Sequence, residues 1–197
     1  MLTLPLLKKI QAIDGWLSEK EADLLLSVTL KSCIDLPPPH NLVEVGSYKG
    51  KSTVLLGSTI KSYFPEAKVY AIDPHEGQIG AQGQSMHTVA PTLDTFLKNI
   101  QASGVAAQVE LIKDVSYHVV WNKPISLLFI DGLHDHFNVA RDFGHFSDWV
   151  SAGGYIAFHD YSPYYPGVVK FVDEVLATGR YRKVQHEDSM MVIQKNK

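Results

Sequence analysis

After about residue 40, the hydrophobic positions alternate between short apolar runs and stretches with helical spacing. Five apolar runs bounded by turn residues predict strands, at 41–45, 68–72, 108–112, 125–130 and 154–158. Helical spacing between and after them predicts helices at 51–63, 92–102, 136–150 and 168–177. Strands that alternate with helices favour right-handed crossovers and a mostly parallel sheet covered on both faces.

The two ends of the chain differ from this alternation. Residues 1–36 have a helical pattern, with Ser18 as a candidate N-cap and Glu21 three residues later, and the prolines at 37–39 end it. Short strands near 181–186 and 190–194 are joined by only a few residues, so they are expected to pair antiparallel. Residues 75–90 are rich in glutamine, histidine and glycine and predict a loop, and a short helical piece is expected at 115–120.

These elements predict an α/β fold with a doubly wound, mostly parallel seven-stranded sheet, an antiparallel last strand and an N-terminal helical preface. At roughly 150 residues per domain, the 197 residues predict one domain. Its expected parts are a helical extension over 1–39 and a catalytic core over 40–197.

Composition excludes several classes of protein. Because the chain has one cysteine, Cys33, it has no internal disulfide and no four-cysteine zinc site. A net charge of -3 argues against nucleic acid as a partner. No apolar run reaches the roughly 20 residues that a membrane span needs. We therefore expect a cytoplasmic protein with no membrane or nucleic-acid partner.

The residues after the strands are the first candidates for chemistry, because ligands of such sheets bind at the carboxyl ends of the strands. From Val43 to Ser52 the sequence reads Val-Glu-Val-Gly-Ser-Tyr-Lys-Gly-Lys-Ser. Tyr48 stands where a dinucleotide-binding loop has its second glycine, and no glycine lies five residues before Gly50 as a phosphate-binding loop requires. The acidic Glu44 beside the turn favours a ligand with a positive charge.

The next two strand ends indicate a nucleoside. Asp73 ends the second strand, where a carboxylate can accept both hydroxyls of a ribose. Taken alone, Asp73 is better explained by an Asp-Pro turn or a helix cap, and only together with Glu44 and Gly46 does it indicate a nucleoside site. Asp114 and Ser116 follow the third strand, where an adenine edge would lie.

Acids and histidines gather after the fourth and fifth strands. Residues 131–136 read Asp-Gly-Leu-His-Asp-His, and His159 and Asp160 end the neighbouring strand. Asp131 and Asp160 would then lie side by side, and such like charges repel unless a cation or a proton lies between them. A divalent metal is the simplest explanation, while a helix-capping Asp131 and a core His159 remain open.

These residues, in this order, resemble class I S-adenosylmethionine-dependent methyltransferases from about residue 40 to the end. The likeness is greatest to the metal-dependent O-methyltransferases typified by catechol O-methyltransferase, and to bacterial relatives that modify sugars and natural products. The resemblance implies S-adenosylmethionine as cofactor, bound by Glu44, Gly46, Ser47, Tyr48, Gly50, Ser52, Asp73, Asp114, Ser116 and Asp131. It also implies a Mg- or Mn-like divalent metal held by Asp131, His159 and Asp160.

His159 departs from the resemblance, because an acid is usual there. Magnesium prefers oxygen ligands, whereas an imidazole favours manganese, iron, cobalt or zinc. Either the metal differs, or His159 points away, or the site is metal-free and His159 is catalytic. His134 is the first candidate for a general base, with His136 and His159 as second choices.

We therefore expect an enzyme that methylates a hydroxyl of a small molecule with metal assistance. The alternatives are a metal-independent methyltransferase, a non-catalytic cofactor-binding module and a dinucleotide-dependent oxidoreductase. Relatives often dimerise, so a homodimer is also open. Trp16 and Trp121 are interpreted as packing residues.

Overall fold

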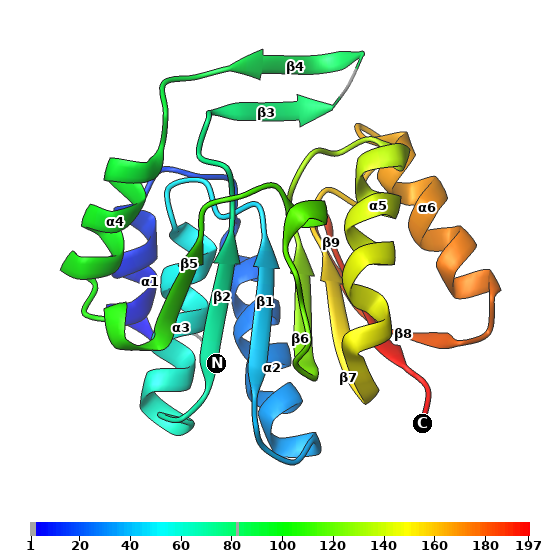
Figure 1. Cartoon of the computed structure of the whole chain (residues 1–197), viewed down its shortest axis with the longest axis horizontal. Coiled ribbons are helices and arrows are strands. Elements are labelled where there is room, and N and C mark those ends of the chain that lie inside the picture. The colour runs from blue at the N-terminus through cyan, green and yellow to red at the C-terminus, as the bar shows by residue number, and fades with distance from the viewer. Residues whose placement is uncertain (1–2, 82) are drawn as a thin grey trace.

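A computed structural model describes residues 3–81 and 83–197 and contains a seven-stranded sheet (Figure 1). Residues 1 and 2 of the expected extension, and residue 82 of the expected loop, lie outside the described residues. In sheet order the strands are β5 (Val109–Ile112), β2 (Lys68–Ile72), β1 (Asn41–Val45), β6 (Ile125–Ile130), β7 (Val150–Phe158), β9 (Met190–Lys195) and β8 (Tyr181–Glu187). The first five are parallel, and β9 runs antiparallel to both β7 and β8. The predicted fold class is confirmed.

Helices cover both faces of the sheet because neighbouring residues of a strand point to opposite sides. Leu42 of β1 belongs to a core shared with α1 (Leu4–Gln11), α2 (Glu19–Asp35), α3 (Lys51–Tyr63) and α4 (Leu93–Ala102). Val43, the next residue, belongs to a second core shared with α5 (His136–Phe146) and α6 (Pro166–Ala177). Every residue of β1 and β6 is buried, as the apolar run at 125–130 predicted for a strand covered on both sides.

The topology places a crevice at one edge of the sheet. From β1 the chain builds outward to β2 and β5, and it then returns to the other side of β1 to build β6 and β7. The order therefore reverses between β1 and β6, and the carboxyl ends of these two strands are where such folds bind ligands.

The N-terminal helices are held by the predicted cap. The hydroxyl of Ser18 accepts a hydrogen bond from the backbone N–H of Glu21 at 3.2 Å, and the Glu21 carboxylate accepts one from the N–H of Ser18 at 2.9 Å. This capping box starts α2, which packs against α3, β6 and β7. Among the described residues, none of the helices combines the length and the apolar character needed to cross a membrane.

The prediction of a loop over residues 75–90 is wrong. Gln78–Ala81 and Gln84–Thr88 form the antiparallel strands β3 and β4, which stand above the carboxyl ends of the sheet (Figure 1). All five residues of β4 are exposed, so the hairpin has no alternation of buried and exposed positions that sequence reasoning could use. Tight backbone approaches shape it instead: a Cβ on Gly80 would lie 2.5 Å from the carbonyl oxygen of Ser85.

Two boundaries differ from prediction by four residues. The helix expected over 136–150 ends at Phe146 and is followed by a 3₁₀ turn, η3 (Ser147–Trp149). The strand expected at 154–158 begins four residues earlier, at Val150. The short helical piece expected at 115–120 is the 3₁₀ turn η2 (Ser116–His118), and a further 3₁₀ turn, η1 (Ala106–Gln108), precedes β5.

Candidate active site

The carboxyl ends of β1, β2 and β6 open into a cavity of about 810 Å³. The β3–β4 hairpin covers one side of it, and the loops after β6 and β7 together with α5 form another. Of the predicted site residues, those that line this cavity are Gly46, Tyr48, Asp73, Ser116, Asp131, His134 and Asp160.

The first turn comes very close to the loop after β6. Gly46 has a φ of +86°, and a Cβ there would lie 2.2 Å from the carbonyl oxygen of Asp131. The backbone N–H of Asp131 donates to the carbonyl of Val45 at 2.8 Å, which joins the two strand ends. Only glycine fits this approach, and its absence of a side chain leaves backbone facing the cavity.

Asp73 fixes the geometry of two loops while facing the cavity. Its Oδ2 accepts a hydrogen bond from the backbone N–H of Tyr48 at 2.8 Å, and its Oδ1 accepts one from the N–H of His75 at 2.6 Å. A carboxylate offers about four lone-pair sites, so two remain for a ligand. This carboxylate therefore has the acceptor capacity that a pair of ribose hydroxyls would use.

A smaller cavity adjoins the first turn and is lined by Ser47 and Ser52 among others. Ser47 is 2% exposed, and its hydroxyl has no hydrogen-bond partner among the residues that the structure describes. Because buried hydroxyls nearly always have a partner, a polar ligand is the natural one here.

Three predicted cofactor residues line neither cavity. Gly50 is the N-cap of α3, with a φ of 88°. Asp114 is exposed and forms an ion pair with His118 at 3.3 Å. Glu44 is fully buried under the first turn, where it accepts a hydrogen bond from the hydroxyl of Thr53. Burial raises the pKa of Glu44 to about 8 against the opposing hydrogen bonds of Ser52 and Thr53.

The far wall contains residues that sequence reasoning missed. Asp142 of α5 is 4% exposed, lines the cavity and accepts a hydrogen bond from the hydroxyl of Ser116. Burial raises the pKa of Asp142 to about 6 despite that hydrogen bond. The Arg141 guanidinium lies 3.8 Å from the centre of the Tyr117 ring, and both side chains line the cavity. Asp142 lies three residues after the buried Val139 on α5, so it shares the buried face of that helix. An acid on such a face is the sequence signal that could have identified it.

Trp16 also differs from the sequence interpretation. It lies in the connection between α1 and α2, is 62% exposed and lines both cavities, with its ring 5.1 Å from that of Tyr48. It is therefore a cavity residue and not a packing residue. Trp121 is buried in the second core, as expected.

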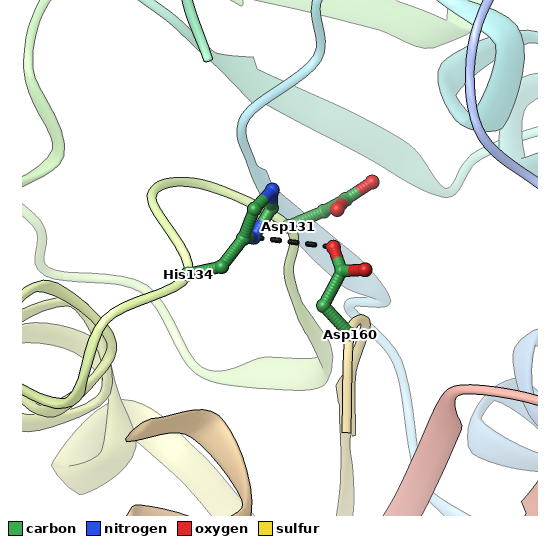
Figure 2. A group of neighbouring side chains, drawn as sticks. All are labelled: Asp131, His134 and Asp160. Atoms are coloured by element: carbon green, nitrogen blue, oxygen red, sulfur yellow. Dashed lines mark ion pairs between the residues drawn. The ribbon is translucent and has the colours of Figure 1, made fainter. Parts of the chain in front are cut away.

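Asp131, His134 and Asp160 come together at the edge of the cavity (Figure 2). One ligand atom of each lies within 4.8 Å of the others, and Nδ1 of His134 is 3.2 Å from Oδ2 of Asp160. The backbone N–H of His134 donates to the carbonyl of Gly80 in the hairpin at 3.0 Å, and its ring lies 4.7 Å from that of Tyr165. Two carboxylates and an imidazole are a suitable donor set for a divalent metal of the manganese or zinc type.

His159 lies behind this group instead of within it. Its Nδ1 is 2.9 Å from Oδ2 of Asp160 and 3.2 Å from Oδ1 of Asp131, while Nε2 is 3.3 Å from Oε2 of Glu21. Burial opposes a charged ring, but these carboxylates outweigh it, and the pKa of His159 lies well above its ordinary value. The group that could hold a metal thus differs from the predicted set in one member, with His134 in place of His159.

His136, the other alternative base, is outside the cavity lining. Its Nε2 lies 2.8 Å from the carboxylate of Glu174 on α6.

Burial raises the pKa of Asp131, with His159 acting against that shift. Asp160 is subject to the same burial effect, but the hydrogen bond from His159 outweighs it and the pKa is lowered. The two carboxylates at the cavity edge therefore differ in basicity.

Comparison with known families decides what kind of domain this is. The family described as a methyltransferase domain matches residues 43–161, which include the first turn, Asp73 and the group around Asp131. The chain belongs to this family. A curated relative, the uncharacterised protein R132 of Acanthamoeba polyphaga mimivirus, is 31% identical over 158 residues. That match covers 74% of this chain, and the chain spans 64% of the relative's length.

Solved structures share the fold of this methyltransferase-family chain at low sequence identity. The O-methyltransferase NovP has a TM-score of 0.75 and 18% identity, covering 90% of this chain and 80% of NovP. TomG of Streptomyces achromogenes, an O-methyltransferase in complex with S-adenosylmethionine, has a TM-score of 0.67 and 14% identity, covering 99% and 91%. An O-methyltransferase of Bacillus cereus in complex with S-adenosylhomocysteine has a TM-score of 0.65 and 17% identity, covering 97% and 89%. The chain therefore shares its fold with these O-methyltransferases.

Proposed function

We propose that this protein transfers the methyl group of S-adenosylmethionine to a hydroxyl group of a small molecule. The observation that carries the proposal is that one cavity contains both Asp73 with the first turn and the Asp131–His134–Asp160 group. The first set suits a nucleoside with an amino-acid tail, and the second suits a hydroxyl that must lose its proton.

Different residues of the chain would bind different parts of the cofactor. Asp73 would accept the ribose hydroxyls, Ser47 and the backbone of Gly46 would contact the amino-acid end, and Ser116 would face the adenine. When bound, the cofactor supplies a sulfonium methyl group, whose bond to sulfur breaks as the bond to the acceptor oxygen forms. The protein's contribution is alignment and management of charge and protons.

His134 is the proposed general base. Asp160 faces Nδ1 of His134 at 3.2 Å, and the Gly80 carbonyl holds its backbone N–H, so the ring is fixed at the cavity edge. Nε2 is then the nitrogen that would accept the proton of the acceptor hydroxyl. An imidazole is suited to this task because its ordinary pKa is near neutrality.

A metal-assisted reaction is a second candidate, favoured by the spacing of the donor atoms. Asp131, His134 and Asp160 would hold the metal, and a divalent ion there would lower the pKa of an acceptor hydroxyl. The two roles of His134 exclude each other, because a neutral imidazole has one ring nitrogen with a free lone pair, and a metal bound there leaves no site for a proton. His159 favours the metal-free reaction, because its Nδ1 already lies 3.2 Å from Oδ1 of Asp131 and 2.9 Å from Oδ2 of Asp160.

Two measurements test these proposals. Calorimetry should show binding of S-adenosylhomocysteine, and incubation with labelled S-adenosylmethionine and a panel of phenols, sugars and secondary metabolites should yield a methylated product. Binding without methylation of any acceptor would favour a non-catalytic module, and no binding at millimolar concentration would overturn the function. Turnover that survives EDTA supports His134 as base, whereas loss that Mn²⁺ restores supports the metal.

A further inference from the structure

We propose that Glu21, on the N-terminal helix α2, is a positioning residue of the reaction centre that orients His159 against Asp131 and Asp160. The proposal rests on the proposed function of that site. It makes the N-terminal extension a part of the site instead of a cover for one face of the sheet.

The Glu21 carboxylate contacts three separate parts of the chain. Oε2 accepts a hydrogen bond from the N–H of Ser18 at 2.9 Å and lies 3.3 Å from Nε2 of His159. Oε1 accepts two hydrogen bonds from Ser189, from its N–H at 2.9 Å and from its hydroxyl at 2.6 Å. Both oxygens are thus engaged, and the residue is 4% exposed.

The capping box alone does not explain this acid. A glutamine at the same helix position can accept the N–H of the cap residue equally well. Burying a carboxylate is costly unless a cation accompanies it. The side chain of His159 is 4% exposed, and its ring is a basic group within hydrogen-bonding reach of Glu21.

The hydrogen-bond partners of His159 determine the role of its ring nitrogens. Carboxylates of this kind only accept hydrogen bonds, and they lie against both of its nitrogens. Nε2–H is therefore directed to Glu21, while Nδ1 faces Asp131 and Asp160. Without Glu21, the ring would lose this partner of Nε2 and could rotate away from the two aspartates that face the cavity.

The turn between β8 and β9 reinforces the arrangement. The carbonyl of Ser189 accepts a hydrogen bond from the N–H of Tyr161, the residue after Asp160, at 2.8 Å. Glu21 thereby reaches Asp160 by two routes, through the ring of His159 and through Ser189.

The test uses Glu21→Gln, with Ser18→Ala as the matched control. Glutamine carries no charge and has one acceptor oxygen in place of two, so it cannot accept hydrogen bonds from Ser18, His159 and Ser189 together. Alanine at 18 removes the cap hydroxyl, which accepts from the Glu21 N–H and donates to Asp188, and leaves the Glu21 carboxylate in place. In the full chain, we expect Glu21→Gln to bind S-adenosylhomocysteine within about twofold of wild type and to lose at least tenfold in kcat, with little change in the acceptor KM. Ser18→Ala should lower the melting temperature and keep kcat within about twofold.

Nuclear magnetic resonance of ¹⁵N-histidine-labelled protein provides a readout that needs neither cofactor nor acceptor. Wild type should show a slowly exchanging Nε2–H signal for His159, and Glu21→Gln should lose or shift that signal. A wild-type spectrum without a protected Nε2–H, or a variant spectrum and kcat that match wild type, would overturn the positioning role. Failure of wild type to bind S-adenosylhomocysteine would instead overturn the proposed function, and the two results are distinguishable.

Discussion

The backbone N–H of His134 donates to the carbonyl of Gly80 at 3.0 Å, which ties the proposed base to the hairpin above it. A second contact joins the same hairpin to the loop after β7, where the side chain of Gln84 donates to the carbonyl of Tyr164 at 2.5 Å. The hairpin is therefore attached to the loops that follow β6 and β7, and its position should affect how the acceptor is held.

Replacing Gly80 with alanine tests this attachment. The new Cβ would lie 2.5 Å from the carbonyl of Ser85, at a backbone φ of +97°, so the hairpin must shift. We expect kcat/KM for the acceptor to fall at least about tenfold, because a 1 Å misplacement can reduce a rate by roughly 10². Affinity for S-adenosylhomocysteine should change little, as isothermal calorimetry would show.

Gly83→Ala is the matched control for that variant. Gly83 has a φ of +77°, but a Cβ there meets no atom within 4 Å. It therefore imposes a comparable backbone strain without the clash. Equal losses in the two variants would mean that strain in the turn, and not the contact with His134, controls the reaction.

Asp73→Asn should weaken binding of S-adenosylhomocysteine by at least about tenfold. Hydrogen bonds to charged groups contribute roughly 1.5–3 kcal/mol, and the amide loses one acceptor oxygen. Asp114→Asn is the control, because Asp114 is exposed and lines neither cavity. A larger loss in the Asp114 variant, measured by calorimetry, would contradict the assignment of the ribose hydroxyls to Asp73.

His134→Ala should lower kcat by roughly 10²- to 10⁴-fold, the usual contribution of a general base. The dissociation constant for S-adenosylhomocysteine should stay near the wild-type value. His136→Ala provides the comparison, since that ring pairs with Glu174 and lies outside the cavity lining. A near-normal rate for the His134 variant would remove this residue from the mechanism.

Glu44→Gln should flatten the dependence of stability on pH. Because burial raises the pKa of Glu44 to about 8 from an ordinary 4.5, the folded state binds more protons than the unfolded state between these values. The free energy of unfolding therefore falls as pH rises through that window, by on the order of a few kcal/mol. Urea unfolding at pH 5 and pH 9 would measure the difference, which should be smaller in the variant. Equal differences in the two proteins would contradict the buried, neutral acid.

Local patterns were sufficient for the order of the elements and for the strand ends. The apolar run at 125–130 predicted β6 because a strand covered on both faces has few polar positions. Gly46 and Asp73 were identifiable because each follows a strand directly and parallel strands end at a common edge. The hairpin was missed for the opposite reason, since all of β4 is exposed and leaves no hydrophobic period.

By itself, the sequence determined the doubly wound fold, the edge at which the cavity lies and the residues that end each strand, because these follow from periodicity and topology. Only the tertiary structure decided which histidine faces the cavity. The contact between Glu21 and His159 joins residues 138 positions apart, and His134 takes its place from Asp160 and Gly80. Side-chain direction in a loop depends on such distant partners, and no local pattern records them.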